Sequence, residues 1–135
     1  MLTFDVNWIA IAVLVFVNMG LGALWYGPLF GKPWMAATGI KMEDIEGKSM
    51  MPPYVIAILN SCFMAFMMAN VLVWAGVDSL GGGLFTGLLM WLGFTGLSFG
   101  VNHAFELRSL YLWFINSTMY LVGLLIMGSV LAIWK

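Results

Sequence analysis

The sequence predicts an all-α protein that crosses a membrane four times as an antiparallel helical bundle. Asp, Glu, Lys and Arg are missing from four long apolar runs, and His103 is the one titratable nitrogen base within them. Each run reaches the roughly 20 residues that a helix needs to cross a hydrocarbon core of about 30 Å. Of the 135 residues, 63% are hydrophobic and 8% are charged, whereas roughly a quarter are charged in soluble domains. A water-soluble fold of this length could not bury so much apolar surface.

Helix boundaries follow from the charge-free runs and from the prolines and glycines between them. We expect transmembrane helices at residues 7–28, 53–75, 83–101 and 109–134, within one domain that covers residues 1–135. Residues 29–52 form the only sizeable loop and lie at the membrane interface. In that loop Pro33 suits the first turn of a short interfacial helix, and Gly39 suits its end. We expect the segment MEDIEGK to add one more turn.

Two short connections predict that consecutive helices are antiparallel neighbours. Asp78 with Gly81, Gly82 and Gly83 predicts a tight turn between the second and third helices. The segment NHAFELR predicts an equally compact turn between the third and fourth helices. Turns this short place consecutive helices side by side in opposite directions.

The positions of Lys and Arg predict the orientation. The first and third loops carry Lys32, Lys41, Lys48 and Arg108, whereas the opposite side carries only Lys135. Because Lys and Arg are retained on the cytoplasmic side, we expect both termini to lie outside. The first residues lack the basic segment and cleavage site of a secretory signal, so we expect the first helix to stay in the mature protein.

Small residues on the third helix predict close helix packing. Gly83 with Gly87 and Gly96 with Gly100 are two pairs spaced four residues apart, and Gly93 lies between the pairs. In lipid this spacing lets two helix backbones approach closely. The partner helix belongs either to the same bundle or to a second copy. We expect a homo-oligomer, because four helices alone enclose side chains rather than water.

Uncharged polar residues lie inside the apolar runs, mostly in the predicted cytoplasmic half. They are Asn18, Asn60, Thr95, Ser98, Asn102 and Asn116, and helical spacing adds Trp25 and Tyr120 to the same stripes. We expect these stripes to converge. Two interpretations stay open: hydrogen bonds between helices, and a cavity that binds a small solute.

The densest group of reactive side chains lies at the inner boundary of the third helix. Asn102, His103, Glu106 and Arg108 follow one another closely and face the loop that begins WYGPLFGKPW. His103 and Glu106 are three residues apart, so they could share a helical face, and Arg108 could pair with Glu106. The group suits a proton relay, a site for an anionic headgroup, or a helix cap with a salt bridge. No nucleophile accompanies it, so we name no catalytic residue.

Composition argues against several kinds of partner. A net charge of -1 gives no electrostatic footprint for nucleic acid. Cys62 is the only cysteine, so no internal disulfide can form, and the sequence offers no set of metal ligands. We therefore expect no metal and no cofactor, and membrane lipid as the surroundings of the chain.

The chain resembles a known family over essentially its whole length. The runs that carry the resemblance are GALWYGPLFGKPW, VNHAFELRSLYLWFIN and LLIMGSVLAIW. They are similar to small bacterial membrane proteins grouped as domain of unknown function DUF1761. The resemblance implies four transmembrane helices in one domain of the bacterial inner membrane, with no established activity. The family more often has Gly at the position of Leu107 and Pro at that of Ser109.

The residues favour a bundle that binds or passes a small solute or lipid through a polar pocket in its cytoplasmic half. The pocket would use hydrogen bonds rather than charge, from Asn18, Trp25, Tyr26, Asn60, Ser98, Asn102, His103, Glu106, Arg108, Asn116 and Tyr120. One alternative is a structural or accessory subunit that docks a partner through the glycine faces of the third helix. Another is a membrane-embedded enzyme that uses His103 and Glu106.

Overall fold

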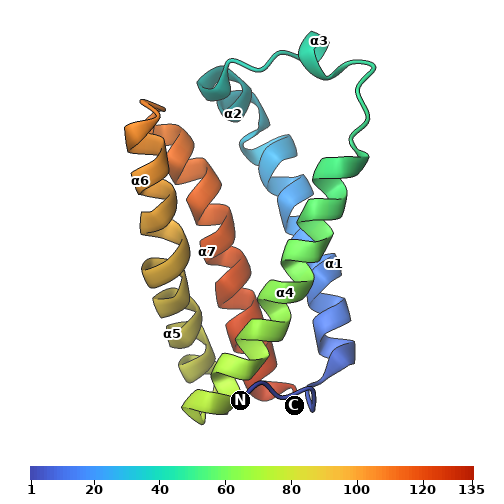
Figure 1. Ribbon diagram of the computed structural model, residues 1–135, viewed down its shortest axis with the longest axis vertical. Coiled ribbons are helices and arrows are strands. Elements are labelled where there is room, and N and C mark those ends of the chain that lie inside the picture. Colours follow the sequence, from blue (N-terminus) through green and yellow to red (C-terminus); the bar gives the residue numbers. More distant parts are fainter.

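The computed structural model describes residues 1–135, of which 81% are helical, and it has no strand. Four long helical segments form an antiparallel bundle (Figure 1). In chain order the elements are α1 (Trp8–Leu24), η1 (Trp25–Leu29), α2 (Gly31–Thr38), α3 (Met42–Ile45), α4 (Met51–Ala75), α5 (Leu80–Met90), η2 (Trp91–Gly96), α6 (Leu97–Phe105) and α7 (Leu110–Ile133). The π-helical segment η1 continues α1, and the π-helical segment η2 joins α5 to α6.

Four segments are long and apolar enough to cross a membrane, so the chain is a membrane protein. They are Trp8–Leu29, Met51–Ala75, Leu80–Phe105 and Leu110–Ile133, of 22 to 26 residues. At about 1.5 Å per residue they reach about 33 to 39 Å, more than the hydrocarbon core of about 30 Å. No Asp, Glu, Lys or Arg lies within them. The predicted all-α bundle of four transmembrane helices is confirmed.

The two ends of the bundle differ in what they contain. Both termini lie at one end, which we call the terminus end, and the long first loop with the α6–α7 turn lies at the other, the loop end (Figure 1). The predicted interfacial helix is present as α2, and Gly39 ends it in the left-handed conformation with φ 74°. The MEDIEGK segment adds the single turn of α3. Which end faces the cytoplasm stays a prediction.

The start of the third span corrects one predicted turn. The helix begins at Leu80 rather than at residue 83, so Gly81, Gly82 and Gly83 form its first turn instead of the connection. The Ser79 side chain accepts a hydrogen bond from the Gly82 amide at 3.2 Å. A serine cap of this kind satisfies an amide that has no helical partner, which lets the helix start three residues early.

The end of the third span corrects the other predicted turn. Helix α6 continues to Phe105, so Asn102 and His103 are helical and the connection is reduced to residues 106–109. Leu107 has φ 57°, a left-handed conformation that favours glycine. The Ser109 side chain then caps α7 by accepting from the Tyr111 amide at 3.1 Å.

Helix α7 is the centre of the bundle. It packs against α1, α4 and the third span, whereas the third span packs mainly against α7. Only 11% of the apolar window of the third span is buried, against 44% for α7. The third span therefore lies at the side of the bundle, with most of its surface left to lipid.

Two of the predicted small residues make the α5–α7 contact possible. A Cβ at Gly83 would overlap the Gly128 carbonyl oxygen of α7 and lie 2.9 Å from the Cβ of Ala132. A Cβ at Gly87 would lie 2.9 Å from the Leu124 carbonyl carbon. The close backbone approach expected from the spacing thus occurs inside one chain at these positions.

The other three predicted packing glycines differ from this pair. Gly93 has no atom within 4 Å of the place where a Cβ would be. Gly96 lies against the Trp91 ring, and a Cβ at Gly100 would lie 3.2 Å from the indole nitrogen of Trp113. At Gly96 and Gly100 the missing Cβ makes room for tryptophan rings rather than for a helix backbone.

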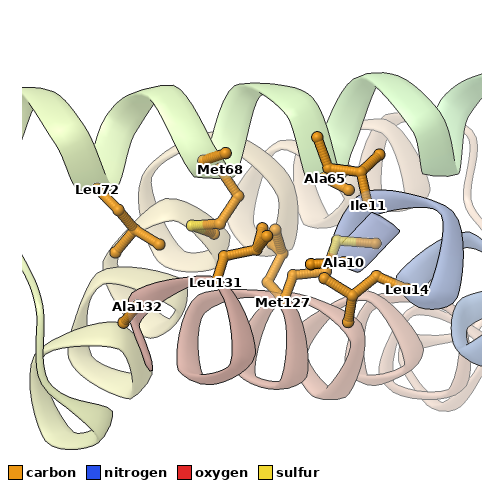
Figure 2. Packing of buried hydrophobic residues seen from close by; sticks show 11 residues of the cluster. Ala10, Ile11, Leu14, Ala65, Met68, Leu72, Met127, Leu131 and Ala132 are labelled. Carbon is orange, nitrogen blue, oxygen red and sulfur yellow. The ribbon is translucent and has the colours of Figure 1, made fainter. Parts of the chain in front are cut away.

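The apolar core lies toward the terminus end (Figure 2). It joins α1, α4 and α7 and contains Ala10, Ile11, Leu14, Ala65, Met68, Ala69, Leu72, Leu124, Met127, Leu131 and Ala132. Lipid tails are as apolar as leucine, so this cluster stabilises the bundle by close packing rather than by removal of apolar surface from water. No residue of the third span belongs to it.

The N-terminal segment is attached to α4 through a buried asparagine. Asn70 is 0% exposed, and its Oδ1 accepts from the Thr3 amide at 2.7 Å while its Nδ2 donates to the Thr3 carbonyl at 3.2 Å. The Trp74 indole donates to the Met1 carbonyl at 3.0 Å. These bonds satisfy backbone groups that lie outside any helix, which matters near a membrane where unpaired groups are costly.

Candidate functional site

Two cavities open beside α7 where the core ends. The α1 cavity, of about 490 Å³, lies between α1, η1, α4 and α7. The α6 cavity, of about 390 Å³, lies between α4, α7 and the third span. Asn60 of α4 and Tyr120 of α7 line both cavities, so the two volumes adjoin at this pair.

Several polar side chains in the α6 cavity have no hydrogen-bond partner in the chain. The side chains of Thr95, Ser98 and Asn102 from the third span line this cavity and make no hydrogen bond within the chain. The Tyr120 hydroxyl likewise has no partner. The Asn60 amide donates only to the Met64 sulfur at 3.1 Å, and a thioether is a weak acceptor. The α6 cavity, including Asn60 and Tyr120 that it shares with the α1 cavity, therefore offers unused hydrogen-bond donors and acceptors.

Asn18 serves the contact between α1 and α4. It is 7% exposed, and its Nδ2 donates to the Ser61 hydroxyl at 2.7 Å. Ser61 in turn donates to the Ala57 carbonyl at 2.9 Å. A Cβ at Gly123 would lie 2.7 Å from Asn18 Oδ1, so the glycine on α7 makes room for the amide. Asn18 thus fits the hydrogen-bonding interpretation, although it also lines the α1 cavity.

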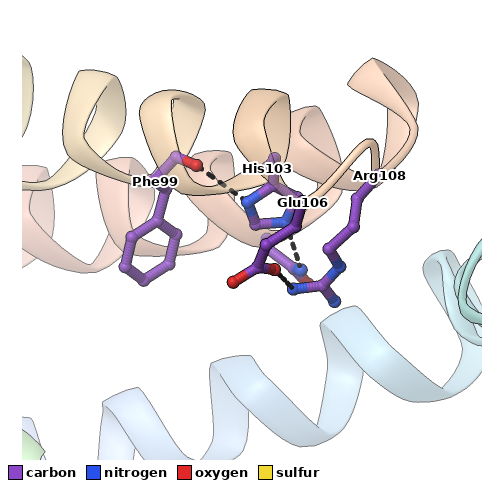
Figure 3. A network of polar contacts seen from close by, with 5 residues as sticks. Phe99, His103, Glu106 and Arg108 are labelled. Carbon is purple, nitrogen blue, oxygen red and sulfur yellow. Dashed lines mark hydrogen bonds and ion pairs between the residues drawn. The ribbon is translucent and has the colours of Figure 1, made fainter.

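A chain of three polar side chains, His103, Asn116 and Tyr26, links three spans near the loop end, and Figure 3 shows its His103 end. His103 is 5% exposed, and its Nδ1 lies 2.8 Å from the Phe99 carbonyl oxygen. A carbonyl only accepts, so Nδ1 carries the proton and Nε2 accepts from Asn116 Nδ2 at 3.4 Å. Asn116 Oδ1 then accepts from the Tyr26 hydroxyl at 3.0 Å. All three side chains thus have a hydrogen-bond partner within the chain.

Tryptophan side chains attach the π-helical segments to α7. The Trp25 indole in η1 donates to the Ile115 carbonyl at 2.8 Å, so Trp25 contacts α7 instead of lining either cavity. The Trp91 indole at the start of η2 donates to the Ser117 carbonyl at 2.7 Å. The Trp113 indole of α7 donates back to the Gly96 carbonyl at 2.8 Å. Both ends of η2 are therefore tied to α7.

The charged pair at the loop end makes no hydrogen bond or ion pair with His103. Glu106 and Arg108 pair with each other at 3.4 Å and are exposed. Helix α6 ends before Glu106, so the expected shared face does not persist, and no hydrogen bond joins His103 to Glu106. In Figure 3 a dashed line joins Glu106 to Arg108, and none joins either residue to His103. His103 faces α7, whereas the ion pair caps the surface of the turn.

Three polar residues that the sequence analysis did not single out contribute to these contacts. Ser61 pairs with Asn18, Asn70 attaches the N-terminal segment, and Ser117 accepts from Trp91 through its carbonyl. The Ser117 hydroxyl is the one buried side-chain polar atom without a partner. The signal that marks Asn18 and Asn60, an uncharged polar residue inside an apolar run, was equally present at these positions.

Neither cavity is lined by Asp, Glu, Lys or Arg. No group of three or more His, Cys, Asp or Glu side chains comes together in the chain. The arrangement can hold a molecule through hydrogen bonds and apolar contact.

A family model described as a protein of unknown function (DUF1761) matches residues 9–132. No curated protein and no solved structure matches the chain.

Proposed function

Because the chain belongs to the DUF1761 family, whose description assigns no activity, we propose a function from the geometry of the bundle. The protein binds a small uncharged molecule between its helices in the loop-end half. The observation that carries this proposal is the pair of cavities that adjoin at Asn60 and Tyr120. Their volumes, about 390 and 490 Å³, fall in the roughly 300–1,000 Å³ range of small-molecule sites.

The unpartnered polar groups favour an occupied cavity. Transfer of an amide or hydroxyl from water into hydrocarbon without a hydrogen-bond partner costs about 4 to 8 kcal/mol. Asn60 and Tyr120 line the α6 cavity and have polar atoms without a strong hydrogen-bond partner. Water or a ligand must supply their partners. A ligand that offers both donors and acceptors satisfies them and gains affinity from doing so.

The absence of charge from both linings favours an uncharged ligand. An ion in a membrane cavity loses its hydration and needs a charged partner to compensate. Glu106, the charged residue closest in sequence to a lining residue, pairs with Arg108 at the surface. Amides and hydroxyls therefore provide the recognition.

The packed core favours binding over passage through a single copy. Toward the terminus end, fully buried side chains such as Leu14 and Leu72 fill the space between α1, α4 and α7. A molecule in the loop-end cavities has no open route past them. A homo-oligomer stays a prediction, and subunit number is read in the same experiment as ligand binding.

Native mass spectrometry of protein released gently from lipid nanodiscs tests this function. We expect an added small mass on the wild-type protein and its loss in the double variant Asn60→Leu and Tyr120→Phe. Thr118→Val is the matched control, because Thr118 lies on α7 near Tyr120 but its hydroxyl bonds to the Phe114 carbonyl and lines neither cavity. Wild-type protein without an added mass, or equal retention in the double variant, would overturn the proposal.

The two alternatives from the sequence have less support. The partner-docking function relied on the glycine face of the third helix, but α7 already covers Gly83 and Gly87. The enzyme relied on His103 and Glu106 acting together, but these side chains lie in separate contacts.

A further inference from the structure

The α6 cavity is open on the side between α4 and the third span. Helix α6 packs against α7, and α4 meets the third span at α5, near the turn that joins them. Toward the loop end α4 leans away from α6 (Figure 1). Lining residues on both sides are exposed, including Met67 at 38% and Phe94 at 73%. Because lipid surrounds the spans, a molecule in the bilayer can reach this cavity sideways.

Polarity changes along the cavity in the same direction on every wall. On α4, Asn60 lies nearer to the loop end than the lining methionines Met64, Met67 and Met68. On the third span, Thr95, Ser98 and Asn102 lie nearer to the loop end than Met90. On α7, Tyr120 lies nearer to it than Leu124. Phe94 and Phe99 line the third-span wall among these polar residues, so the cavity combines polar groups with aromatic rings toward the loop end and is apolar toward the terminus end.

The length of the cavity matches one leaflet of a bilayer. Met90 and Asn102 are twelve residues apart, which corresponds to about 18 Å of helix. The hydrocarbon core of a bilayer is about 30 Å thick, so one leaflet contributes about half of that. The volume of about 390 Å³ lies near the lower limit for small-molecule sites, which favours one hydrocarbon chain over two.

From the side opening, the polarity gradient and the length, we propose that the α6 cavity binds a single-chain neutral lipid of the monoacylglycerol class. The hydroxylated head lies at Ser98 and Asn102, and the chain lies along the methionines. This inference rests on the proposed function and specifies its ligand.

The side chains in the cavity fit both parts of this ligand. Amide and hydroxyl groups donate and accept, as glycerol hydroxyls and an ester carbonyl require. No Lys or Arg lines the cavity to hold a phosphate, which disfavours a charged head. Methionine is flexible and polarisable, so this wall adapts to chains of different shape.

The test uses the full chain in phosphatidylcholine nanodiscs and three probes. The probes are monooleoylglycerol, free glycerol as the head without a chain, and oleoyl lysophosphatidate as the same chain with a charged head. Bound mass is counted by native mass spectrometry over a concentration series. We expect monooleoylglycerol to bind at least about tenfold more tightly than either other probe, because loss of the chain or desolvation of the phosphate each exceeds about 1.4 kcal/mol.

Variants locate the binding. Asn102→Leu with Ser98→Ala should weaken monooleoylglycerol binding by about tenfold or more. Val101→Leu is the control, because Val101 is exposed on the same helix and does not line the cavity. Ser98, Val101 and Asn102 lie on the surface of the bundle or at the cavity, so we expect each variant to unfold at the same temperature as the wild type. A thermal melt of each variant checks this.

Three outcomes would overturn the inference. Glycerol that binds as tightly as monooleoylglycerol would show that the hydrocarbon chain of the lipid does not contribute to binding. Oleoyl lysophosphatidate that binds as tightly as monooleoylglycerol would show that a neutral head is not required. Unchanged monooleoylglycerol binding in the double variant would show that the α6 cavity is not the binding site. A retained native molecule that depends on Asn60 and Tyr120 but has no hydrocarbon chain would overturn the lipid assignment and leave the proposed function standing.

Discussion

The close contact between α5 and α7 predicts that one methyl group at Gly83 destabilises the whole bundle. In Gly83→Ala the new Cβ would lie 2.7 Å from the Gly128 carbonyl carbon and 2.9 Å from the Ala132 Cβ. Two of the three nearest obstacles are backbone atoms, which cannot rotate away as a flexible side chain can. The helices themselves must separate.

The size of the effect follows from that separation. Ordinary Cβ contacts begin at 3.4 Å, so the helices must move apart by more than the roughly 0.7 Å that the carbonyl carbon alone requires, because the Gly128 carbonyl oxygen is closer still. Overpacking of this kind costs about 1 to 3 kcal/mol. The ratio of folded to unfolded protein should fall by about 5-fold to about 150-fold. This loss is large because the third span packs mainly against α7 and makes few contacts with the other helices.

Unfolding in mixed micelles, followed by far-UV circular dichroism as the fraction of dodecyl sulfate rises, measures this loss. Gly81→Ala is the matched control, because it lies two residues away on α5 and has no atom within 4 Å of its Cβ position. Alanine is the better helix former by up to about 1 kcal/mol, so the control should be as stable as the wild type or slightly more stable. Equal stability of Gly83→Ala and Gly81→Ala would refute the reasoning.

Two further predictions concern hydrogen bonds. Asn70→Leu removes the partners of the Thr3 backbone, and we expect amide hydrogen exchange at Thr3 to rise about fivefold; unchanged exchange there would contradict the role of Asn70. Trp113→Phe removes the indole donor to Gly96 and should lower the free energy of unfolding by about 0.6 to 1.7 kcal/mol in the same micelle assay. Trp8→Phe, which loses an exposed local bond to Phe4, is its control, and equal losses would argue against a special role for Trp113.

The polar residues show how far sequence reasoning extends. Their type and depth predicted a polar region in one half of the bundle, and in the structure Asn60 and Tyr120 line two adjoining cavities. Their partners were not predictable, because a contact such as that of Tyr26 with Asn116 joins residues 90 positions apart. His103 illustrates the limit, since the spacing pointed to Glu106 while the fold provides Asn116.

The π-helical segments are a second feature that periodicity missed. A charge-free apolar run predicts a helix, but it does not predict that the backbone hydrogen bonds of η1 and η2 span five residues, as in a π-helix, rather than four. In η1 a proline, Pro28, lies inside the segment, and in η2 the indoles of Trp91 and Trp113 hold both ends against α7. These bonds form between separate helices, so a local pattern does not contain them.

The sequence by itself determined the class of the protein and the number of its spans. Backbone groups in hydrocarbon must be paired within their own segment, so length and absence of charge are enough to define a membrane helix. Only the tertiary structure decided that Gly83 meets Gly128 inside one chain, that α4 leaves the α6 cavity open, and that Asn18 pairs with Ser61. These features depend on how the helices cross, and in lipid the crossing is set by the close fit of particular side chains rather than by hydrophobicity.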